Sequence, residues 1–361
     1  MTTATPRALL LLLGATGVAL PLAAQAPALR GLDPVALCQG QEIPGTGEFV
    51  ASHAGYAYQF ASAAHRATFQ KEPDRYGVQL GGACARMGPL SGLGDPARFL
   101  VYKERIYLFA SDGCREGFKK RTDAFLDVTD AAPTPDAANL AAANELLARA
   151  AAAHGGSDRL RAMRGYSHER TATKGETTET WRLHLQWPNA ARFEHDSMQK
   201  EKAWHFAHVV AADTAFFDDN GKGRAMSNDA RTEVLRTLAH EPLAALREAL
   251  EGRARLAAAG KREVLGSTVD ELVVWQHGHS TTFGLGADGR IETARFRGRG
   301  PGLWFGAVEL RFADCTTIQG VTVPTTVRGT FEGKDEPSFA AKRIGLAIDP
   351  TFAADTFVRR Q

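Results

Sequence analysis

An internal repeat is the feature that most constrains how this chain of 361 residues can fold. Residues 58–76, YQFASAAHRATFQKEPDRY, recur without gaps as residues 107–125, YLFASDGCREGFKKRTDAF, at a constant offset of 49. Repeats of this kind indicate duplicated structural units. The sequence therefore predicts that the first part of the chain contains two copies of one small fold.

Each copy has the pattern of a strand followed by a short helix. Aromatic residues alternate in Gly55–Phe60 and again in Arg105–Phe109, which is typical of half-buried strands. Ser62 and Ser111 then stand where the N-cap of a helix belongs. The inward-facing residues of these two helices are expected to be Phe69 and Phe118.

The third residue after each serine is His65 in the first copy and Cys114 in the second. Both are expected in the first helical turn, where exposed N–H groups and the helix dipole favour a thiolate and disfavour an imidazolium. Metal ligands must be deprotonated, so this position suits a soft or borderline metal ion.

Several motifs in residues 31–126 resemble the YHS domain, a small treble-clef-like module often associated with heavy-metal handling. They are Leu32–Val35, Phe60–His65, Glu72–Tyr76, Gly81–Ala85 and Phe109–Cys114. The resemblance implies a tandem YHS-like domain over residues 29–126 that holds a metal ion such as copper or zinc. The ligands it implies are Cys114, Cys84, Cys38 and His65. The sequence departs from the family at Ala36, where the metal-binding type has a cysteine.

The four cysteines allow other interpretations as well. In an oxidising compartment Cys84 can pair with Cys114, or Cys38 can pair with Cys84. Inert buried thiols are the third alternative, and Cys315 is expected to be one. A catalytic thiol is disfavoured because the sequence has no Cys-x-x-Cys motif and no evident partner base.

The first 28 residues have the order of a secretory signal peptide. Arg7 precedes an apolar run over Ala8–Leu22, which glycines and a proline interrupt, and small residues follow. The run is too short and too broken to span a bilayer, which takes about 20 apolar residues. We expect cleavage within residues 24–28 and a mature protein that is periplasmic or secreted.

Residues 127–139 are polar with two prolines, which is the composition of a linker before a second domain over residues 140–361. A helix is expected at Ala138–Ala153. Short alternating runs then predict an antiparallel sheet, interrupted by a helical segment over Asp229–Glu251. The expected fold class is α+β: a small duplicated YHS-like module followed by a curved antiparallel half-barrel packed on helices.

Three segments of the second domain resemble outer-membrane lipoprotein-sorting (lipoprotein carrier) proteins: Leu146–Leu160, Asp288–Arg295 and Phe312–Pro324. The resemblance implies a sheet wrapped round a helix, with an apolar cleft for acyl chains or another amphiphile. Apolar and aromatic residues that alternate on two expected strands are candidates to line such a cleft. They are Trp181, Leu183, Leu185, Trp204 and Phe206. The alternative is that these residues simply fill the domain core.

The net charge of +2 gives no electrostatic case for nucleic acid as a partner. Sequence motifs of serine hydrolases, zinc proteases and phosphate-binding loops are absent, so binding is favoured over catalysis. We expect a soft metal ion in the first domain and a lipid or other apolar small molecule in the second. The alternatives are a structural or partner-binding envelope protein with a disulfide-stabilised first module, and an enzyme whose site has no recognisable signature.

Export can be tested directly. In a bacterium with a periplasm, the protein is expected in the periplasmic fraction without its first 24–28 residues, because the signal is removed on secretion. Intact-mass spectrometry gives the new N-terminus. Full-length chain in the membrane fraction would identify an uncleaved anchor instead.

Overall fold

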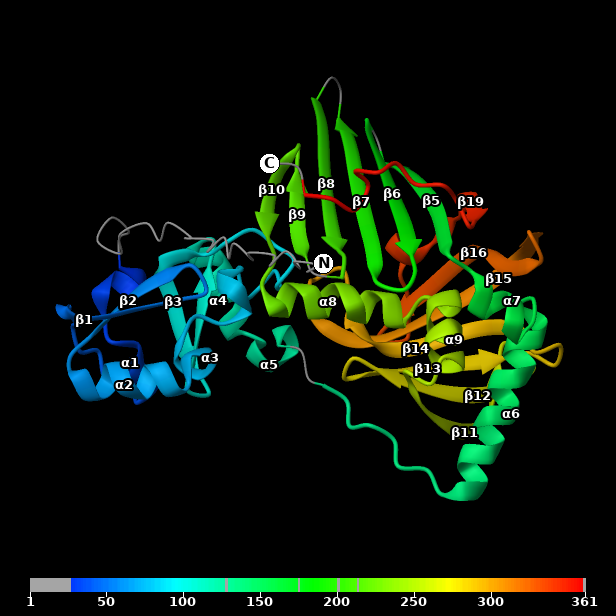
Figure 1. Ribbon diagram of the computed structural model, residues 1–361, viewed down its shortest axis with the longest axis horizontal. Helices are drawn as coiled ribbons and strands as arrows, with labels where there is room; N and C mark the ends of the chain where they lie inside the picture. The colour runs from blue at the N-terminus through cyan, green and yellow to red at the C-terminus, as the bar shows by residue number, and fades with distance from the viewer. Residues whose placement is uncertain (1–26, 127–128, 175, 200–201, 213, 360–361) are drawn as a thin grey trace, which may run out of the picture.

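The computed structural model describes residues 27–126, 129–174, 176–199, 202–212 and 214–359. Apart from Pro27 and Ala28, the expected signal peptide lies outside these residues. The described chain has a small N-terminal module, up to residue 126, and a larger body beside it (Figure 1). Among the described residues, no helix combines the length and the apolar character that crossing a membrane requires.

The internal repeat forms two similar units, each a β-hairpin followed by helices. The first contains β1 (Thr46–His53), β2 (Tyr56–Phe60), α2 (Ala63–Lys71) and α3 (Pro73–Tyr76), and the second contains β3 (Asp95–Tyr102), β4 (Arg105–Phe109), α4 (Asp112–Lys119) and α5 (Thr122–Phe125). η2 (Ala28–Gly31) and α1 (Pro34–Cys38) precede the first unit, and η3 (Leu80–Gly82) lies between the two. β1 pairs with β2, and β3 with β4.

Local sequence signals explain why the units have this form. The Ser62 hydroxyl accepts the N–H of His65 at 3.2 Å, and the Ser111 hydroxyl accepts that of Cys114 at 3.1 Å, so both predicted N-caps are confirmed. The two inward-facing phenylalanines, Phe69 and Phe118, are buried as expected. Whether the module belongs to the YHS family stays a prediction.

A buried carboxylate, that of Asp33, ties the first unit together. It accepts the N–H groups of Val35 at 2.8 Å and Ala36 at 3.1 Å and so caps α1. It also accepts the N–H of Ala61, just after β2, at 2.8 Å. Its Oδ2 lies 2.7 Å from Nδ1 of His65 in α2. One side chain thereby joins α1 to the end of β2 and to α2, about 30 residues further along the chain.

The larger body consists of two antiparallel sheets with helices packed on them, which confirms the α+β class. Its helices are α6 (Ala137–Ala153), α7 (Ser157–Ala162), α8 (Asn228–Ala239), α9 (Pro242–Leu250) and the short η4 (Pro337–Phe339). The first sheet has the order β10-β9-β8-β7-β6-β5-β19. Its strands are β5 (Gly165–Lys174), β6 (Thr177–Gln186), β7 (Ala190–Gln199), β8 (Lys202–Val210), β9 (Ala215–Asp219), β10 (Lys222–Ala225) and β19 (Ile344–Ile348).

The second sheet runs in the order β11-β12-β13-β14-β15-β16-β17, and β18 also pairs with β16. Its strands are β11 (Arg255–Val264), β12 (Ser267–Gln276), β13 (His279–Leu285), β14 (Ile291–Arg299), β15 (Phe305–Ile318), β16 (Val321–Phe331), β17 (Lys334–Asp335) and β18 (Ala341–Lys342). Neither sheet is closed, and α8 and α9 lie between them in Figure 1.

The strands of the larger body are divided between two sheets, whereas the sequence predicted a single half-barrel. The helical segment predicted over Asp229–Glu251 forms α8 and α9, which separate β10 from β11 along the chain. The last expected strand, over Ser338–Ile348, is instead η4, β18 and β19. β19 returns to pair with β5, so the end of the chain supplies an edge of the first sheet.

The main hydrophobic core lies where α6, α7 and α9 pack on the second sheet. Side chains of the first sheet, such as Tyr166 and Leu185, complete it. The segment before α6 is held against this sheet although its composition predicts a linker. The N–H of Asp130 donates to Gly278 O at 2.7 Å, its carboxylate accepts the N–H of Ser280 at 2.7 Å, and its carbonyl accepts the Trp275 indole N–H at 2.9 Å.

Removal of the Asp33 carboxylate should loosen the N-terminal module. Asp33→Ala leaves three backbone donors and His65 without their acceptor, which we expect to cost roughly 2–4 kcal/mol. Hydrogen exchange followed by mass spectrometry should show faster exchange in residues 33–76. Asp112→Ala is the matched control, because that carboxylate is 67% exposed and only ion-paired at the surface. Equal exchange in the two variants would contradict the role given to Asp33.

Candidate functional site

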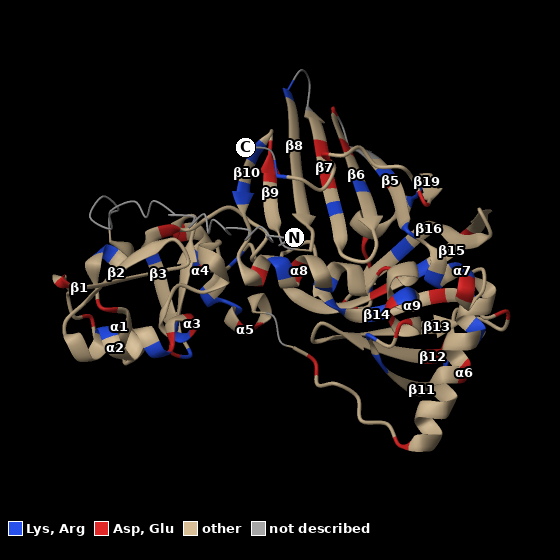
Figure 2. Ribbon diagram, viewed as in Figure 1, with Lys and Arg blue, Asp and Glu red and all other residues tan. Residues whose placement is uncertain are grey.

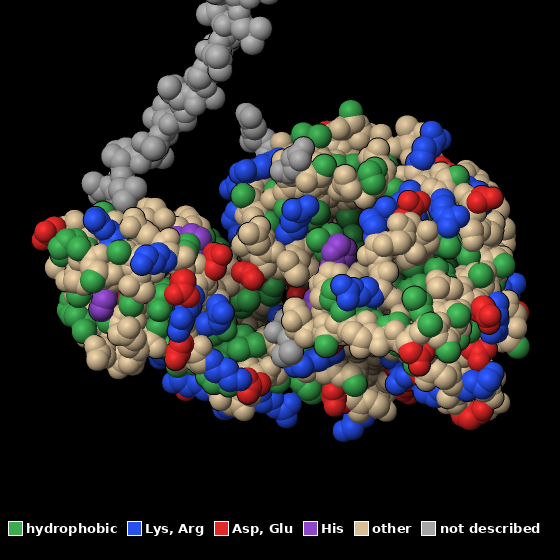
Figure 3. Space-filling view, turned by 60° about the horizontal axis from the view of Figure 1, so that its bottom comes forward, with side chains coloured by type: hydrophobic (Ala, Val, Ile, Leu, Met, Phe, Trp, Pro, Cys, Tyr) green, Lys and Arg blue, Asp and Glu red, His purple; other side chains and the backbone are tan. Residues whose placement is uncertain are grey.

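A cavity of about 680 Å³ lies between the two sheets and α8. Its walls come from β5–β8 of the first sheet, from α8, and from β14–β16 of the second. The space-filling view shows a hollow in the larger body, on the side next to the N-terminal module (Figure 3). Clefts that bind small ligands measure about 300–1,000 Å³ and are mostly apolar, so this cavity has the size of a ligand site.

Aromatic rings form a continuous row along the first-sheet wall. The Trp181 ring stacks on His195 with centroids 5.0 Å apart, and His195 meets Trp204 edge-on at 5.5 Å. Trp204 stacks on Phe206 at 5.5 Å, and Phe206 meets His208 at 4.4 Å. The row runs along β8, where side chains two residues apart share a face, and it continues across β7 to β6.

The structure brings together most of the residues predicted to line a cleft. Trp181, Leu183, Trp204 and Phe206 all line the cavity. Leu185 does not line the cavity and is buried in the main core. The alternation of β6 puts it on the same face as Leu183, which belongs to that core as well. That these residues contact a ligand stays a prediction.

Four histidines also line the cavity, and burial keeps them neutral: His168, His195, His208 and His240. Desolvation lowers the pKa of His208 to about 4. It also lowers the pKa of His168 and of His240 well below the ordinary value, with further repulsion from Arg343 at His168 and from Arg236 at His240. The His240 ring stacks on Phe296 with a centroid distance of 3.6 Å. These imidazoles therefore behave as flat, weakly polar wall groups near neutral pH.

The carboxylates on the α8–α9 side of the cavity are held by guanidinium groups. Glu241 forms a two-pronged pair with Arg343, with N–O distances of 3.0 and 2.8 Å. Glu233 accepts hydrogen bonds from Arg236 and from Nε of Arg299. Both carboxylates are therefore neutralised by direct pairing with guanidinium groups of the cavity wall.

The N-terminal module forms part of the cavity wall. Leu90, in the loop after Cys84, lines the cavity, and its backbone hydrogen-bonds to His208. The module approaches α8 closely at Gly81, where an added Cβ would lie 2.2 Å from the Ser227 Cβ. The Asp229 carboxylate accepts hydrogen bonds from the backbone of Gly81. No local pattern in the sequence signals this contact, which joins residues more than a hundred positions apart.

The four residues expected to bind a metal ion are not brought together. The His65 imidazole is paired with Asp33, and Cys38 packs in the core of the first unit, where burial raises its thiol pKa to about 11. Only Cys84 and Cys114 share a hydrogen bond. No group of three or more His, Cys, Asp or Glu side chains within the described ranges could hold a metal ion. The expected copper or zinc site is therefore not supported, because the duplicated units keep their equivalent positions apart.

The prediction for Cys315 is wrong, since this residue is exposed. It lies in the second half of β15, opposite Pro324 of β16. Ala313, Asp314 and Cys315 are exposed in succession, so burial does not alternate there as strand periodicity predicts.

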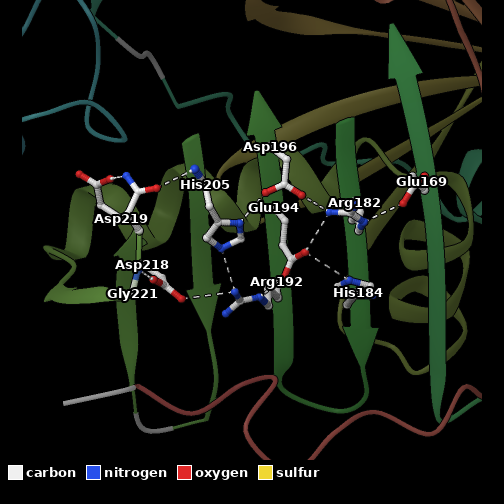
Figure 4. A network of polar contacts seen from close by, with 11 residues as sticks. Glu169, Arg182, His184, Arg192, Glu194, Asp196, His205, Asp218, Asp219 and Gly221 are labelled. Atoms are coloured by element: carbon white, nitrogen blue, oxygen red, sulfur yellow. Dashed lines mark hydrogen bonds and ion pairs between the residues drawn. The ribbon is translucent and has the colours of Figure 1, made fainter. Parts of the chain in front are cut away.

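Charged residues of β6 and β7 (Figure 2) belong to a second polar cluster, whose side chains alternate with those of the aromatic row (Figure 4). Two of its members, Arg182 and Glu194, also line the cavity. Arg182 binds Glu169 at 2.6 Å and also pairs with Asp196, whose Oδ1 lies 2.6 Å from Nδ1 of His205. Arg192 pairs with Glu194. The C-terminal segment covers part of the cluster, since Arg192 is buried and donates to the carbonyl of Thr356 at 3.3 Å.

Comparison with solved structures gives several distant matches. A putative outer membrane lipoprotein-sorting protein domain from Vibrio parahaemolyticus matches 59% of this chain and 95% of its own, at 13% identity and a TM-score of 0.37. A LolA superfamily protein from Nitrosomonas europaea matches 60% and 97%, at 11% identity and a TM-score of 0.34. A DUF1329 family protein from Desulfovibrio piger matches 61% and 97%, at 10% and 0.33. No family model and no curated protein matches the sequence.

Of the two disulfides considered from the sequence, the structure favours Cys84–Cys114. The Cys114 thiol has its pKa lowered by hydrogen bonds from Ser111 and Cys84 and by Arg86, whereas burial raises the pKa of Cys84. Mild oxidation should link these two residues and leave Cys38 reduced, because Cys114 is partly exposed and the most readily ionised of them. Alkylation and peptide mapping measure this. A Cys38–Cys84 link would contradict the prediction, and Cys114→Ser is the control.

Proposed function

We propose that this chain is an exported binding protein that holds a lipid or another apolar small molecule in the cavity between its two sheets. The observation that carries the proposal is the row of aromatic rings along a cavity of about 680 Å³. Four of the side chains in that wall are those that the sequence singled out, and their alternation on β6 and β8 turns them to one face.

The physical basis is the burial of apolar surface. Each Å² of apolar area removed from water contributes about 25 cal/mol of binding free energy. An acyl chain that covers two tryptophans and a phenylalanine therefore gains several kcal/mol, which offsets the entropic cost of ordering the chain. An aromatic wall suits this task because large rings lose little conformational entropy on binding. The Trp204 side chain is 40% exposed, so the wall still has apolar area to cover.

The N-terminal module takes part in this function as a wall of the site. Its Leu90 lines the same cavity as Trp204 and Phe206, and its loop is fixed by the close approach of Gly81 to Ser227. The two parts of the chain therefore cooperate in one site, and a metal ion is not required for that role.

Quenching of tryptophan fluorescence by a brominated acyl chain tests the proposal. Titration with dibromostearate should quench the protein saturably, and Trp181→Phe combined with Trp204→Phe should remove most of that quenching. Trp275→Phe is the matched control, because this ring is bonded to the Asp130 carbonyl and does not line the cavity. Trp204→Ala should weaken binding about tenfold, or ~1.4 kcal/mol. Quenching that survives in the double variant would place the ligand elsewhere.

A further inference from the structure

Arg170 is a cation of the cavity wall that pairs with no carboxylate among the described residues. It follows His168 by two residues on β5, and both side chains line the cavity. Its guanidinium carbon lies 4.0 Å from the centroid of the Trp181 ring. Its one hydrogen bond among the described residues goes to Ser338 O, at 3.4 Å. No carboxylate in the described part of the chain forms an ion pair with it.

The other buried guanidinium beside it is neutralised. Arg343 is bound through both prongs by Glu241. Arg170 instead feels the repulsion of Arg343, and burial together with that repulsion lowers its pKa, while Glu179 opposes the shift from a distance. The Glu179 carboxylate is 40% exposed and lies 3.8 Å from Nε2 of His195. The field at the Arg170 end of the cavity is therefore positive.

His168 supplies a second, independent observation at the same place. Its Nδ1 is buried and has no hydrogen-bond partner among the described residues. A buried polar atom without a partner is uncommon, because it forfeits the hydrogen bond it would make to water. The cavity wall at β5 thus holds two neighbouring groups that lack a partner among the described residues. They are the Arg170 guanidinium, which has no anion, and Nδ1 of His168, which has no hydrogen bond.

Resting on the proposed function, we infer that the cavity selects amphiphiles whose head group is an anion, a carboxylate or a phosphate, and that Arg170 pairs with that head group. The aromatic row begins at Arg170, over Trp181, and leads across His195 to Trp204 and Phe206. The acyl chain lies along this row and the charge rests at its β5 end. Guanidinium groups suit both anions, because their N–H fork matches two oxygens of either.

Four amphiphiles with the same twelve-carbon chain separate head-group selection from chain binding. They are laurate, dodecyl phosphate, monolaurin and dodecyltrimethylammonium, each titrated by calorimetry below its micelle concentration. The wild-type protein should bind the two anions at least tenfold more tightly than neutral monolaurin and bind the cation most weakly. The order of laurate and dodecyl phosphate shows which anion fits better, and either order supports the inference.

Variants of Arg170 test whether this residue selects the anionic head group. Arg170→Gln should reduce the affinity for the anions about tenfold and leave monolaurin within twofold of wild type, which also shows that the variant is folded. Arg170→Lys should retain part of the preference. Arg255→Gln is the matched control, since Arg255 lies over the ring of Trp275, at 5.7 Å, on an exposed edge strand. It removes one charge without touching the cavity, so its affinities should be those of wild type.

Two outcomes would overturn the inference. Equal affinity of the wild type for laurate, dodecyl phosphate and monolaurin would show that no head group is selected. An unchanged preference in Arg170→Gln would show that another group selects it. Failure of all four amphiphiles to bind is a different result, because it removes the proposed function itself.

Discussion

The buried ion pair between Arg343 and Glu241 joins the parts of the larger body around the cavity. Glu241 directly precedes α9 in the turn after α8, and Arg343 lies between β18 and β19. The Arg343 N–H donates to Thr325 O of β16 at 2.7 Å, and its guanidinium reaches the Tyr166 hydroxyl of β5 at 3.3 Å. One residue, through its backbone and its side chain, thus links the second sheet, the helices and the first sheet. A buried pair adds little net stability, but loss of one partner leaves a buried charge, so the arrangement is strongly specified.

The cavity follows from this arrangement. With α8 and α9 held between the sheets, the inner face of β5–β8 cannot collapse fully onto the second sheet, and its aromatic rings remain open to a ligand. Because Glu241 is paired with Arg343, Arg170 has no carboxylate partner in the part of the chain that the structure describes. The chain binding and the head-group selection that we propose would therefore have one structural origin. The N-terminal module completes the enclosure through Leu90.

Much of the fold was accessible from local pattern. The repeat predicted a strand, a serine N-cap and a short helix in each copy, and alternation located most strands of the body. The first strand of each hairpin, β1 or β3, was not predicted. β11 was missed, because Arg255–Val264 is rich in alanine and charge and has little β propensity; pairing with β12 along its length makes it a strand. The four aromatic and aliphatic residues of the cavity wall were found, but Leu185 was not separated from them. His168 and Arg170 are two residues apart on an expected strand, which places both side chains on one face. That spacing does not tell which face of the strand is buried.

The sequence by itself determined what depends on neighbours along the chain: the caps at Ser62 and Ser111, the inward phenylalanines, and the common face of Trp181 and Leu183. These follow from helical and strand periodicity, which are short-range properties. Only the tertiary structure decided which cysteines meet, how the strands divide into two sheets, and which cation keeps a partner. Those outcomes depend on contacts between residues far apart in the chain, such as Glu241 with Arg343, whose pairing no local spacing encodes.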